Sequence, residues 1–144
     1  MLVQQILTMK PSHTVVTIAP TATLGEAVDL LAAHRIGAVV VSTDGKRVAG
    51  ILSERDVVRE LGKHGTACLS FRIERVMTAK IISCTAGEQA NQVLQKMTDG
   101  RFRHMPVMDG DVMLGLISIG DVVKARLAEL SMEKDALESM IKGF

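Results

Sequence analysis

The chain repeats itself: Gly50-Ile51-Leu52-Ser53-Glu54-Arg55-Asp56-Val57-Val58 returns as Gly115-Leu116-Ile117-Ser118-Ile119-Gly120-Asp121-Val122-Val123. Glycine, serine, aspartate and both valines recur at an offset of 65 residues, as does the pair Asp-Gly at 44 and again at 109. Upstream, the segment 27–36 aligns with 93–102 after a slip of one residue. Internal repetition of this kind indicates two copies of one structural unit.

Caps and apolar periodicity predict the helices of the first copy. Thr23 is a candidate N-cap, and Glu26 three residues later completes a capping box. Apolar residues at helical spacing continue from there to about Arg35. A second helix is expected to begin at Ser53 and to end at Gly62.

Three short strands complete the first copy. Residues 15–18 are β-rich, and the run 38–41 is apolar throughout, as in a buried strand. The Asp44-Gly45 pair is a hairpin signal, and the strand 48–52 follows it. The second copy is expected to repeat this β-α-β-β-α order, with strands at 81–82, 104–108 and 113–117 and helices at 88–98 and from 118 onward.

The predicted domains are a first unit at 1–65, a second unit at 66–130 and a C-terminal helical extension at 131–144. Two short helical segments, 2–9 and 73–77, are expected to be counterparts of each other. Each copy is too small to bury much surface alone, so the copies are expected to pack on each other.

Composition excludes several classes of protein. The chain has no Trp, no Tyr and three Phe, so it lacks the aromatic faces on which single-stranded nucleic acids stack. The formal charge is +1, without the basic excess of a protein that binds phosphate backbones. No segment approaches the roughly 18 apolar residues of a membrane span. Neither nucleic acid nor membrane is therefore an expected partner.

Cysteine usage and the N-terminus favour the cytoplasm. Cys68 and Cys84 have no Cys-x-x-Cys spacing and no histidine at ligand spacing, so they are interpreted as buried thiols of a reducing compartment and no metal is expected. Residues 1–6 lack the cationic start and apolar run of a signal peptide.

The paired serine and aspartate of each repeated stretch have two interpretations. In the local one, Ser53 and Ser118 are N-caps, and Asp56 and Asp121 complement the helix dipole. In the functional one, the free N–H groups of the helix attract phosphate while the carboxylate accepts hydrogen bonds from ribose hydroxyls. Both can hold together, and repetition of the whole motif favours the functional one.

The densest cationic cluster is Arg101-Phe102-Arg103-His104-Met105-Pro106-Val107. Cations there complement the C-terminus of the preceding helix. Alternatively, Arg103 and His104 lie at the start of a strand, and arginine suits bidentate contact with phosphate. Arg55, in the first turn of its helix, is a second candidate phosphate ligand.

No constellation of catalytic residues can be assembled from the chain. It shows no Ser-His-Asp order, paired catalytic carboxylates, Walker loop or Gly-x-Gly-x-x-Gly motif. The protein is therefore not expected to be an enzyme.

The sequence resembles the tandem cystathionine-β-synthase-type (CBS) domain pair, over about residues 2–127. The resemblance is carried by the two Gly-x-x-Ser-x-x-Asp turns, the segment 103–107 before a strand, the Val-Met-Thr of 76–78 and the offset of 65 residues. It implies an α/β (α+β) fold, in which two β-α-β-β-α units pack through their sheets with pseudo-two-fold symmetry and leave two clefts between them.

In this family the clefts bind adenine nucleotides such as AMP, ADP, ATP or NAD(H), and sometimes S-adenosylmethionine. AMP is the first choice here, as a regulatory ligand rather than a catalytic cofactor. By position, the aspartates would hold the ribose hydroxyls, the serines would lie by ribose or phosphate, the cations would meet phosphates, and the first strands would offer backbone contacts to adenine. The implied ligand-binding residues are Thr17, Ser53, Arg55, Asp56, Ile82, Arg103, His104, Pro106, Ser118 and Asp121.

The two copies depart from each other in ways that make the clefts unequal. The first has Gly37-Ala38-Val39-Val40 where the second has Arg103-His104-Met105-Pro106, so its expected phosphate contacts are poorer. The second has Ile119-Gly120 where the first has Glu54-Arg55. Arg55 and the cationic cluster are expected to serve different clefts or opposite ends of one ligand.

The expected function is that of a standalone regulatory module, dimeric like its family, that signals to a separate and unidentified effector protein. The alternative is a structural adaptor with vestigial clefts. The long last helix, 121–141, carries apolar residues at spacings of three, four and seven, interrupted by Lys134. It could lie along its own domain or contribute to a dimer.

Overall fold

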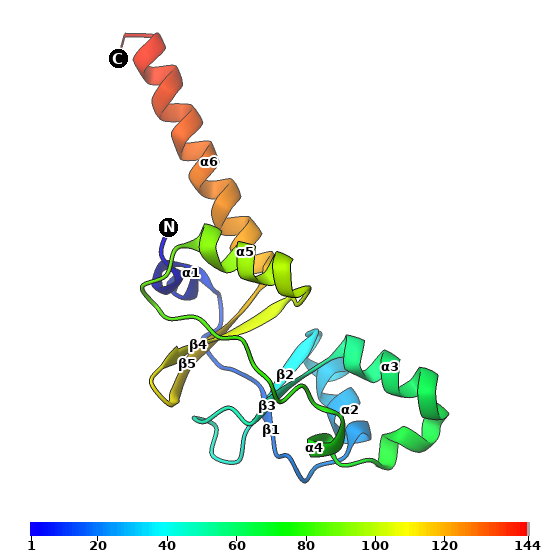
Figure 1. Cartoon of the computed structure of the whole chain (residues 1–144). Helices are drawn as coiled ribbons and strands as arrows, with labels where there is room; N and C mark the ends of the chain where they lie inside the picture. The colour runs from blue at the N-terminus through cyan, green and yellow to red at the C-terminus, as the bar shows by residue number, and fades with distance from the viewer. Residues whose placement is uncertain (144) are drawn as a thin grey trace. The chain divides into compact units, whose positions relative to one another are not determined.

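The structure is a computed structural model, and it describes residues 1–143. Phe144, the last residue of the predicted extension, lies outside the described residues. The chain forms a mixed α/β fold that divides into two compact units (Figure 1). The first-repeat unit holds residues 14–82 and 109–114, and the second-repeat unit holds 1–13, 83–108 and 115–143.

The first-repeat unit contains a three-stranded sheet in the order β1-β2-β3. Strand β1 is parallel to β2, with Thr17 opposite Val40, and β2 is antiparallel to β3, with Ala38 opposite Ser53. The predicted order of elements is confirmed. The elements are β1 (Thr17–Ile18), α2 (Leu24–His34), β2 (Ala38–Val41), β3 (Gly50–Ser53), α3 (Glu54–His64), a 3-10 helix η1 (Gly65–Ser70) and α4 (Ile73–Val76).

The second-repeat unit repeats the helix and hairpin pattern around the pair β4-β5. Its elements are α1 (Val3–Met9), α5 (Ala90–Gly100), β4 (His104–Asp109), β5 (Val112–Ser118) and α6 (Ile119–Ile141). The turn between β4 and β5, residues 109–114, clusters with the first-repeat unit, where Met113 N donates to Lys46 O at 2.8 Å. The long C-terminal helix is confirmed and runs well past α1 and α5 (Figure 1).

The two short helices complete the cores of opposite repeats. Val3 and Ile6 of α1 are buried in the core of the second-repeat unit. Ile73 and Val76 of α4 are buried in the core of the first-repeat unit. The compact units therefore interleave along the chain, whereas the predicted boundaries at 65 and 130 describe the order of the sequence repeats and stay a prediction.

The predicted end of α3 at Gly62 is wrong. The helix continues to His64 and ends at Gly65, whose φ of +62° is a left-handed conformation that glycine adopts at little cost. A glycine inside a helix costs only about 1 kcal/mol relative to alanine, so Gly62 weakens α3 without ending it. The expected linker at 63–70 is instead the last turn of α3 followed by η1, in which Cys68 is buried.

The strand predicted at residues 81–82 is also wrong. From the segment 81–84, Cys84 pairs with β4, in an isolated parallel bridge to Val107. In the first repeat Val40 N donates to Val16 O at 3.1 Å, but Pro106 stands at the position of Val40 and has no N–H to donate. The pairing between the segment 81–84 and β4 therefore consists of two hydrogen bonds, which join Cys84 to the backbone of Pro106 and of Met108.

Candidate functional site

Each repeated Ser-x-x-Asp motif forms a capping box at the start of a helix. At α3, Asp56 N donates to Ser53 Oγ at 3.4 Å and Ser53 N donates to Asp56 Oδ2 at 2.9 Å. At α6, Asp121 N donates to Ser118 Oγ at 3.1 Å and Ser118 N donates to Asp121 Oδ2 at 2.9 Å. The local interpretation of both motifs is confirmed, and it leaves open what else the carboxylates bind.

The carboxylate of Asp56 is buried, and both of its oxygens accept hydrogen bonds. Its Oδ1 accepts from Arg59 Nη1 at 2.9 Å and from Thr78 Oγ1 at 3.5 Å, while Oδ2 also accepts from Ser53 Oγ at 3.2 Å. Arg59 is fixed in turn by donating to Val76 O at 3.3 Å. The side chain of Asp56 is only 6% exposed, so its carboxylate forms these hydrogen bonds inside the first-repeat unit.

Asp121 is more open than its counterpart. Its side chain is 24% exposed, and Lys10 Nζ lies 3.0 Å from Oδ2 while also donating to Leu116 O at 2.7 Å. The hydrogen bond from Ser118 N and the ion pair with Lys10 both involve the same carboxylate oxygen, Oδ2. Burial alone would raise the pKa of Asp121, but the hydrogen bonds from Ser118 and Lys10 and the charge of Lys10 hold it below its usual value. The carboxylate is therefore ionised near neutral pH.

The backbone places Arg103 beside the start of α6. Ile119 N donates to Arg103 O at 2.8 Å, and in the first repeat Glu54 N donates to Gly37 O at 2.9 Å in the same way. The second repeat therefore has an arginine at the backbone position beside the helix N-terminus where the first repeat has glycine. We call Lys10, Arg103, Ser118 and Asp121 the Asp121 site.

The remaining predicted residues are divided between the two units. Thr17 and the exposed Arg55 lie in the first-repeat unit with Ser53 and Asp56. His104, half-buried, and Pro106, buried, lie on β4 in the second-repeat unit with Ser118 and Asp121.

Ile82 is exposed and lies outside any strand, so it is not placed as expected. Ile18 O accepts from Ser42 N, and Cys84 O accepts from Met108 N in the same way. The counterpart of Thr17 is therefore Ser83, because the offset between the repeats is 66 residues in this half of the unit.

Sequence reasoning missed three residues that hold the aspartates. Arg59 follows Asp56 by three residues on one helix, a spacing that could have been read as an ion pair. Thr78 belongs to a segment already noted as a motif, but its hydrogen bond to Asp56 depends on tertiary structure. Lys10 gave no signal, because α1 packs against a repeat far along the chain.

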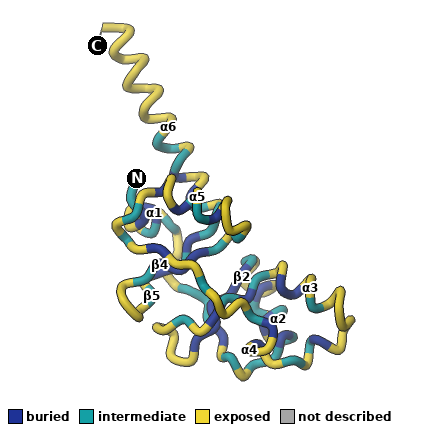
Figure 2. The backbone as a smooth tube through the Cα atoms, viewed as in Figure 1, coloured by how far each residue is buried: buried dark blue, intermediate teal, exposed yellow. Residues whose placement is uncertain are grey.

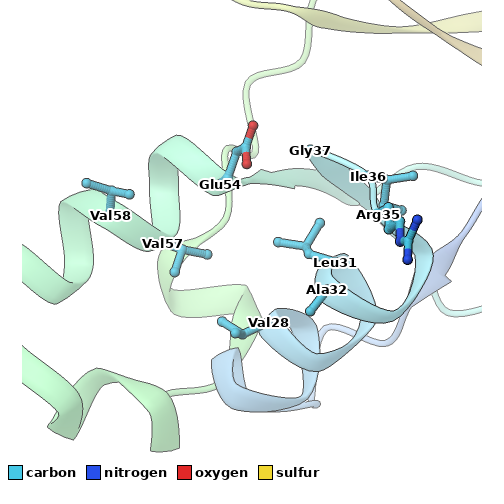
Figure 3. A pocket seen from close by; sticks show the side chains of 9 residues that line it. All are labelled: Val28, Leu31, Ala32, Arg35, Ile36, Gly37, Glu54, Val57 and Val58. Carbon is cyan, nitrogen blue, oxygen red and sulfur yellow. The ribbon is translucent and has the colours of Figure 1, made fainter.

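A separate open groove of about 510 Å³ lies between α2 and α3 of the first-repeat unit. Val28 and Leu31 of α2 face Val57 of α3 across it, and Arg35 and Glu54 stand at one end (Figure 3). Its full lining is Val28, Leu31, Ala32, Arg35, Ile36, Gly37, Glu54, Val57 and Val58. The predicted ligand-binding residues do not line this groove, whose lining is mostly apolar.

Comparison with protein families identifies the repeats. The family model of the CBS domain matches the chain twice, at residues 3–63 and 73–128. This chain belongs to the CBS-domain family. Both matches include a capping box, so the motifs that cap α3 and α6 lie inside the family's own repeats.

Several relatives match nearly the whole CBS pair. A CBS-domain-containing protein from Agrobacterium tumefaciens has 42% identity and a TM-score of 0.82, with 87% of this chain and 92% of that chain covered. A protein with CBS domains from Burkholderia ambifaria has 38% identity and a TM-score of 0.82, over 89% of this chain and 95% of that chain. The fold class expected from the sequence is thereby confirmed.

Among curated proteins, the mitochondrial CBS domain-containing protein CBSX3 of Arabidopsis thaliana is 37% identical over 84% of this chain. The alignment spans 61% of the length of CBSX3. An uncharacterized 17.7 kDa protein of Acidianus ambivalens is 30% identical over 98% of this chain and 82% of its own length. Among residues 1–143, no helix is long and apolar enough to cross a membrane.

Proposed function

We propose that this CBS pair is a non-enzymatic regulatory module that binds an adenine nucleotide and signals to a separate effector protein. AMP is the first candidate ligand, and ADP, ATP and NAD(H) are the others. We propose the cytoplasm as its compartment, because its two cysteines are buried and form no disulfide, as is usual in a reducing environment.

The Asp121 site is the observation that carries the proposal. A partly exposed, ionised carboxylate such as that of Asp121 can accept hydrogen bonds from the vicinal hydroxyls of a ribose, as acidic residues do in dinucleotide-binding folds. The N-terminus of α6 and the ammonium of Lys10 supply positive charge near that carboxylate, and Arg103, whose backbone oxygen accepts from Ile119 N, is a candidate phosphate ligand at the same helix end. The site therefore combines the two chemistries that a nucleotide requires.

The first-repeat unit supports a weaker site. Asp56 would have to exchange hydrogen bonds from Arg59 and Thr78 for those of a ribose, and Gly37 offers no phosphate ligand where the second repeat has Arg103. We therefore propose unequal binding, with the first nucleotide held at the Asp121 site.

A structural neighbour shows what the fold accommodates elsewhere. The CBS domain pair of protein MJ0100, with 22% identity and a TM-score of 0.77, is in complex with methylthioadenosine and S-adenosylmethionine. The likeness concerns the fold, and for this chain the residues of the Asp121 site carry the argument.

The absence of Trp and Tyr makes a direct test simple. The polypeptide is nearly transparent at 280 nm, so a co-purified nucleotide would stand out near 260 nm. Calorimetric titration of the nucleotide-free protein with AMP, ADP, ATP and NADH would then rank the ligands. Absence of binding by all four at millimolar concentration would overturn the proposal.

Two alanine variants distinguish the two aspartates. Asp121→Ala removes the proposed ribose acceptor, and we expect nucleotide affinity to fall by about tenfold or more, since a hydrogen bond to a charged group contributes about 1.5–3 kcal/mol. Asp56→Ala leaves Arg59 and the Ser53 N–H without their buried acceptor, so we expect the larger loss of folding stability, about 2–4 kcal/mol. Urea denaturation followed by circular dichroism measures stability, and calorimetry measures affinity.

Self-association is part of the proposal. Val58 is an exposed part of the lining of the apolar groove between α2 and α3, a face that a second copy could cover (Figure 3). A neighbour of 25% identity, the CBS-CP12 protein of bloom-forming cyanobacteria, is hexameric. We propose a homodimer.

The exposed second half of α6 favours a second candidate function, that of a structural adaptor. In that case truncation after Leu127 would abolish binding to a partner protein, and nucleotides would have no effect on it.

A further inference from the structure

Within residues 1–143, one apolar stripe on α6 remains exposed. Val123, Leu127, Leu130, Leu137 and Ile141 follow one another along the helix at spacings of four and three residues, with Lys134 in the remaining place. The five apolar side chains are between 41% and 85% exposed. We call these six residues the α6 seam.

The α6 seam is distinct from the face that α6 packs against its own unit. Val122 and Ala125 are buried in the core of the second-repeat unit, and that contact face ends near Glu129. From residue 131 to the end of α6 every residue is exposed (Figure 2). The seam therefore continues for several turns beyond anything that its own unit covers.

The spacing is that of a coiled-coil heptad. If Leu127, Lys134 and Ile141 occupy a positions, then Val123, Leu130 and Leu137 occupy d positions, without a break over 123–141. From this pattern we propose that the α6 seam pairs with the seam of a second copy, and that the two helices run antiparallel. In this register Val123 packs against the partner's Ile141, and Leu127 against the partner's Leu137.

Charge decides between the two orientations. In a parallel pair each Lys134 would face its own counterpart at an a position, and Glu133 at g would face the partner's Glu138 at e, so both contacts would be repulsive. In the antiparallel pair Lys134 packs its stem beside the partner's Leu130, and Lys124 lies opposite the partner's Glu138, an attractive contact that occurs twice.

One like-charge contact remains in the antiparallel pair. Glu133 approaches the partner's Glu133 at the dyad, where the two Lys134 ammonium groups flank it. The inference rests on the proposed homodimer and adds to its α2–α3 face a second contact, in which the two α6 helices pair and run antiparallel. It does not depend on nucleotide binding.

Cysteine cross-linking in the full chain tests the direction. Ser131 lies at an e position near the dyad, so Ser131→Cys should form a disulfide-linked dimer under mild oxidation, whereas in a parallel pair e faces g. Ser139→Cys is the matched control, because Ser139 is also exposed but lies at an f position that points away from the partner. Cys68 and Cys84 are buried, so the introduced thiol is the accessible one.

A charge exchange provides a second test. Lys124→Glu should weaken the dimer about tenfold in sedimentation equilibrium at low salt, and adding Glu138→Lys should restore it, since the pair is then reversed. A dimer in which Ser131→Cys and Ser139→Cys cross-link equally, or not at all, would overturn the antiparallel seam while leaving the homodimer standing. A monomer would overturn both, and neither result bears on nucleotide binding, which absorbance and calorimetry report separately.

Discussion

The thiol of Cys84 shows how burial controls chemistry at a single residue. It is 2% exposed, and its Sγ donates to Pro106 O at 3.8 Å. Burial raises the pKa of Cys84 to about 11, and the carboxylate of Glu88 adds to the increase, against a smaller opposing effect of Lys96. Because the thiolate is the reactive form, this cysteine is expected to be inert in the folded protein.

We predict that Cys84 does not react with Ellman's reagent at pH 8 unless the second-repeat unit unfolds. The folded pKa lies above the unfolded one, so the stabilising effect of the neutral thiol is complete below pH 9 and is lost between pH 9 and 11. The free energy of unfolding of the natural protein should therefore fall more steeply with pH across that range than that of Cys84→Ala. Prompt labelling of Cys84 in the folded protein would contradict this account. So would an equal dependence of the unfolding free energy on pH in the natural protein and in Cys84→Ala.

The residues that the sequence predicted best are those whose partners are close along the chain. The capping boxes that begin α2, α3 and α6 each join a side chain to a backbone N–H three residues away, so the motif alone specifies the contact. Lys10 could not be predicted beside Asp121, because nothing near residue 121 indicates which repeat α1 joins.

At the scale of single elements, two glycines allow the hairpin strands to approach their neighbours. A Cβ on Gly50 of β3 would lie 2.5 Å from Met77 Sδ and 3.0 Å from Thr78 O. A Cβ on Gly115 of β5 would lie 2.8 Å from Leu7 Cδ2. The contact with Thr78 involves backbone that is itself paired with Ile51, whereas Leu7 is a flexible side chain.

Gly50→Ala should therefore destabilise the protein more than Gly115→Ala. We expect a loss of about 2–3 kcal/mol for Gly50→Ala, within the range of overpacked cores, and about 1 kcal/mol for Gly115→Ala, where Leu7 can change rotamer. Gly62→Ala is the control, because a Cβ there meets nothing within 4 Å and the change should stabilise α3. Equal losses at Gly50 and Gly115 in urea denaturation would show that the backbone of Thr78 yields as readily as a side chain.

Element types followed from the sequence, but two boundaries required tertiary knowledge. The Asp-Gly hairpins and apolar runs are local signals, and β2, β3, β4 and β5 lie where they predict. The predicted helix end at Gly62 was wrong because α3 ends at Gly65, the glycine whose φ is positive. The strand at 81–82 failed because Pro106, distant in sequence, removes the donor that such a strand would need.

At the scale of the whole molecule, the chain exchanges its short helices between repeats. Leu2 bridges to Gln89 and Thr23 to Arg72, so α1 enters the second repeat and α4 the first through equivalent contacts. Repetition in the sequence showed that there are two units and that α1 and α4 correspond. It did not show which unit each helix completes, because both are amphipathic segments with the same apolar pattern.

Two matched variants test this exchange. Ile6 and Ile73 are 2% and 0% exposed in different cores, and replacing either by alanine should cost about 2–4 kcal/mol through lost contacts and a cavity. Ile6→Ala should expose amides of α5, β4 and α6 to hydrogen exchange before those of β2 and β3, and Ile73→Ala should do the reverse. Ile6 lies at the opposite end of the chain from α6. Loss of amide protection in α6 in the Ile6→Ala variant would therefore show that residues 1–13 belong to the second-repeat unit in solution. Loss of protection confined to β2 and β3 in Ile6→Ala would instead assign α1 to the repeat that follows it directly in the sequence.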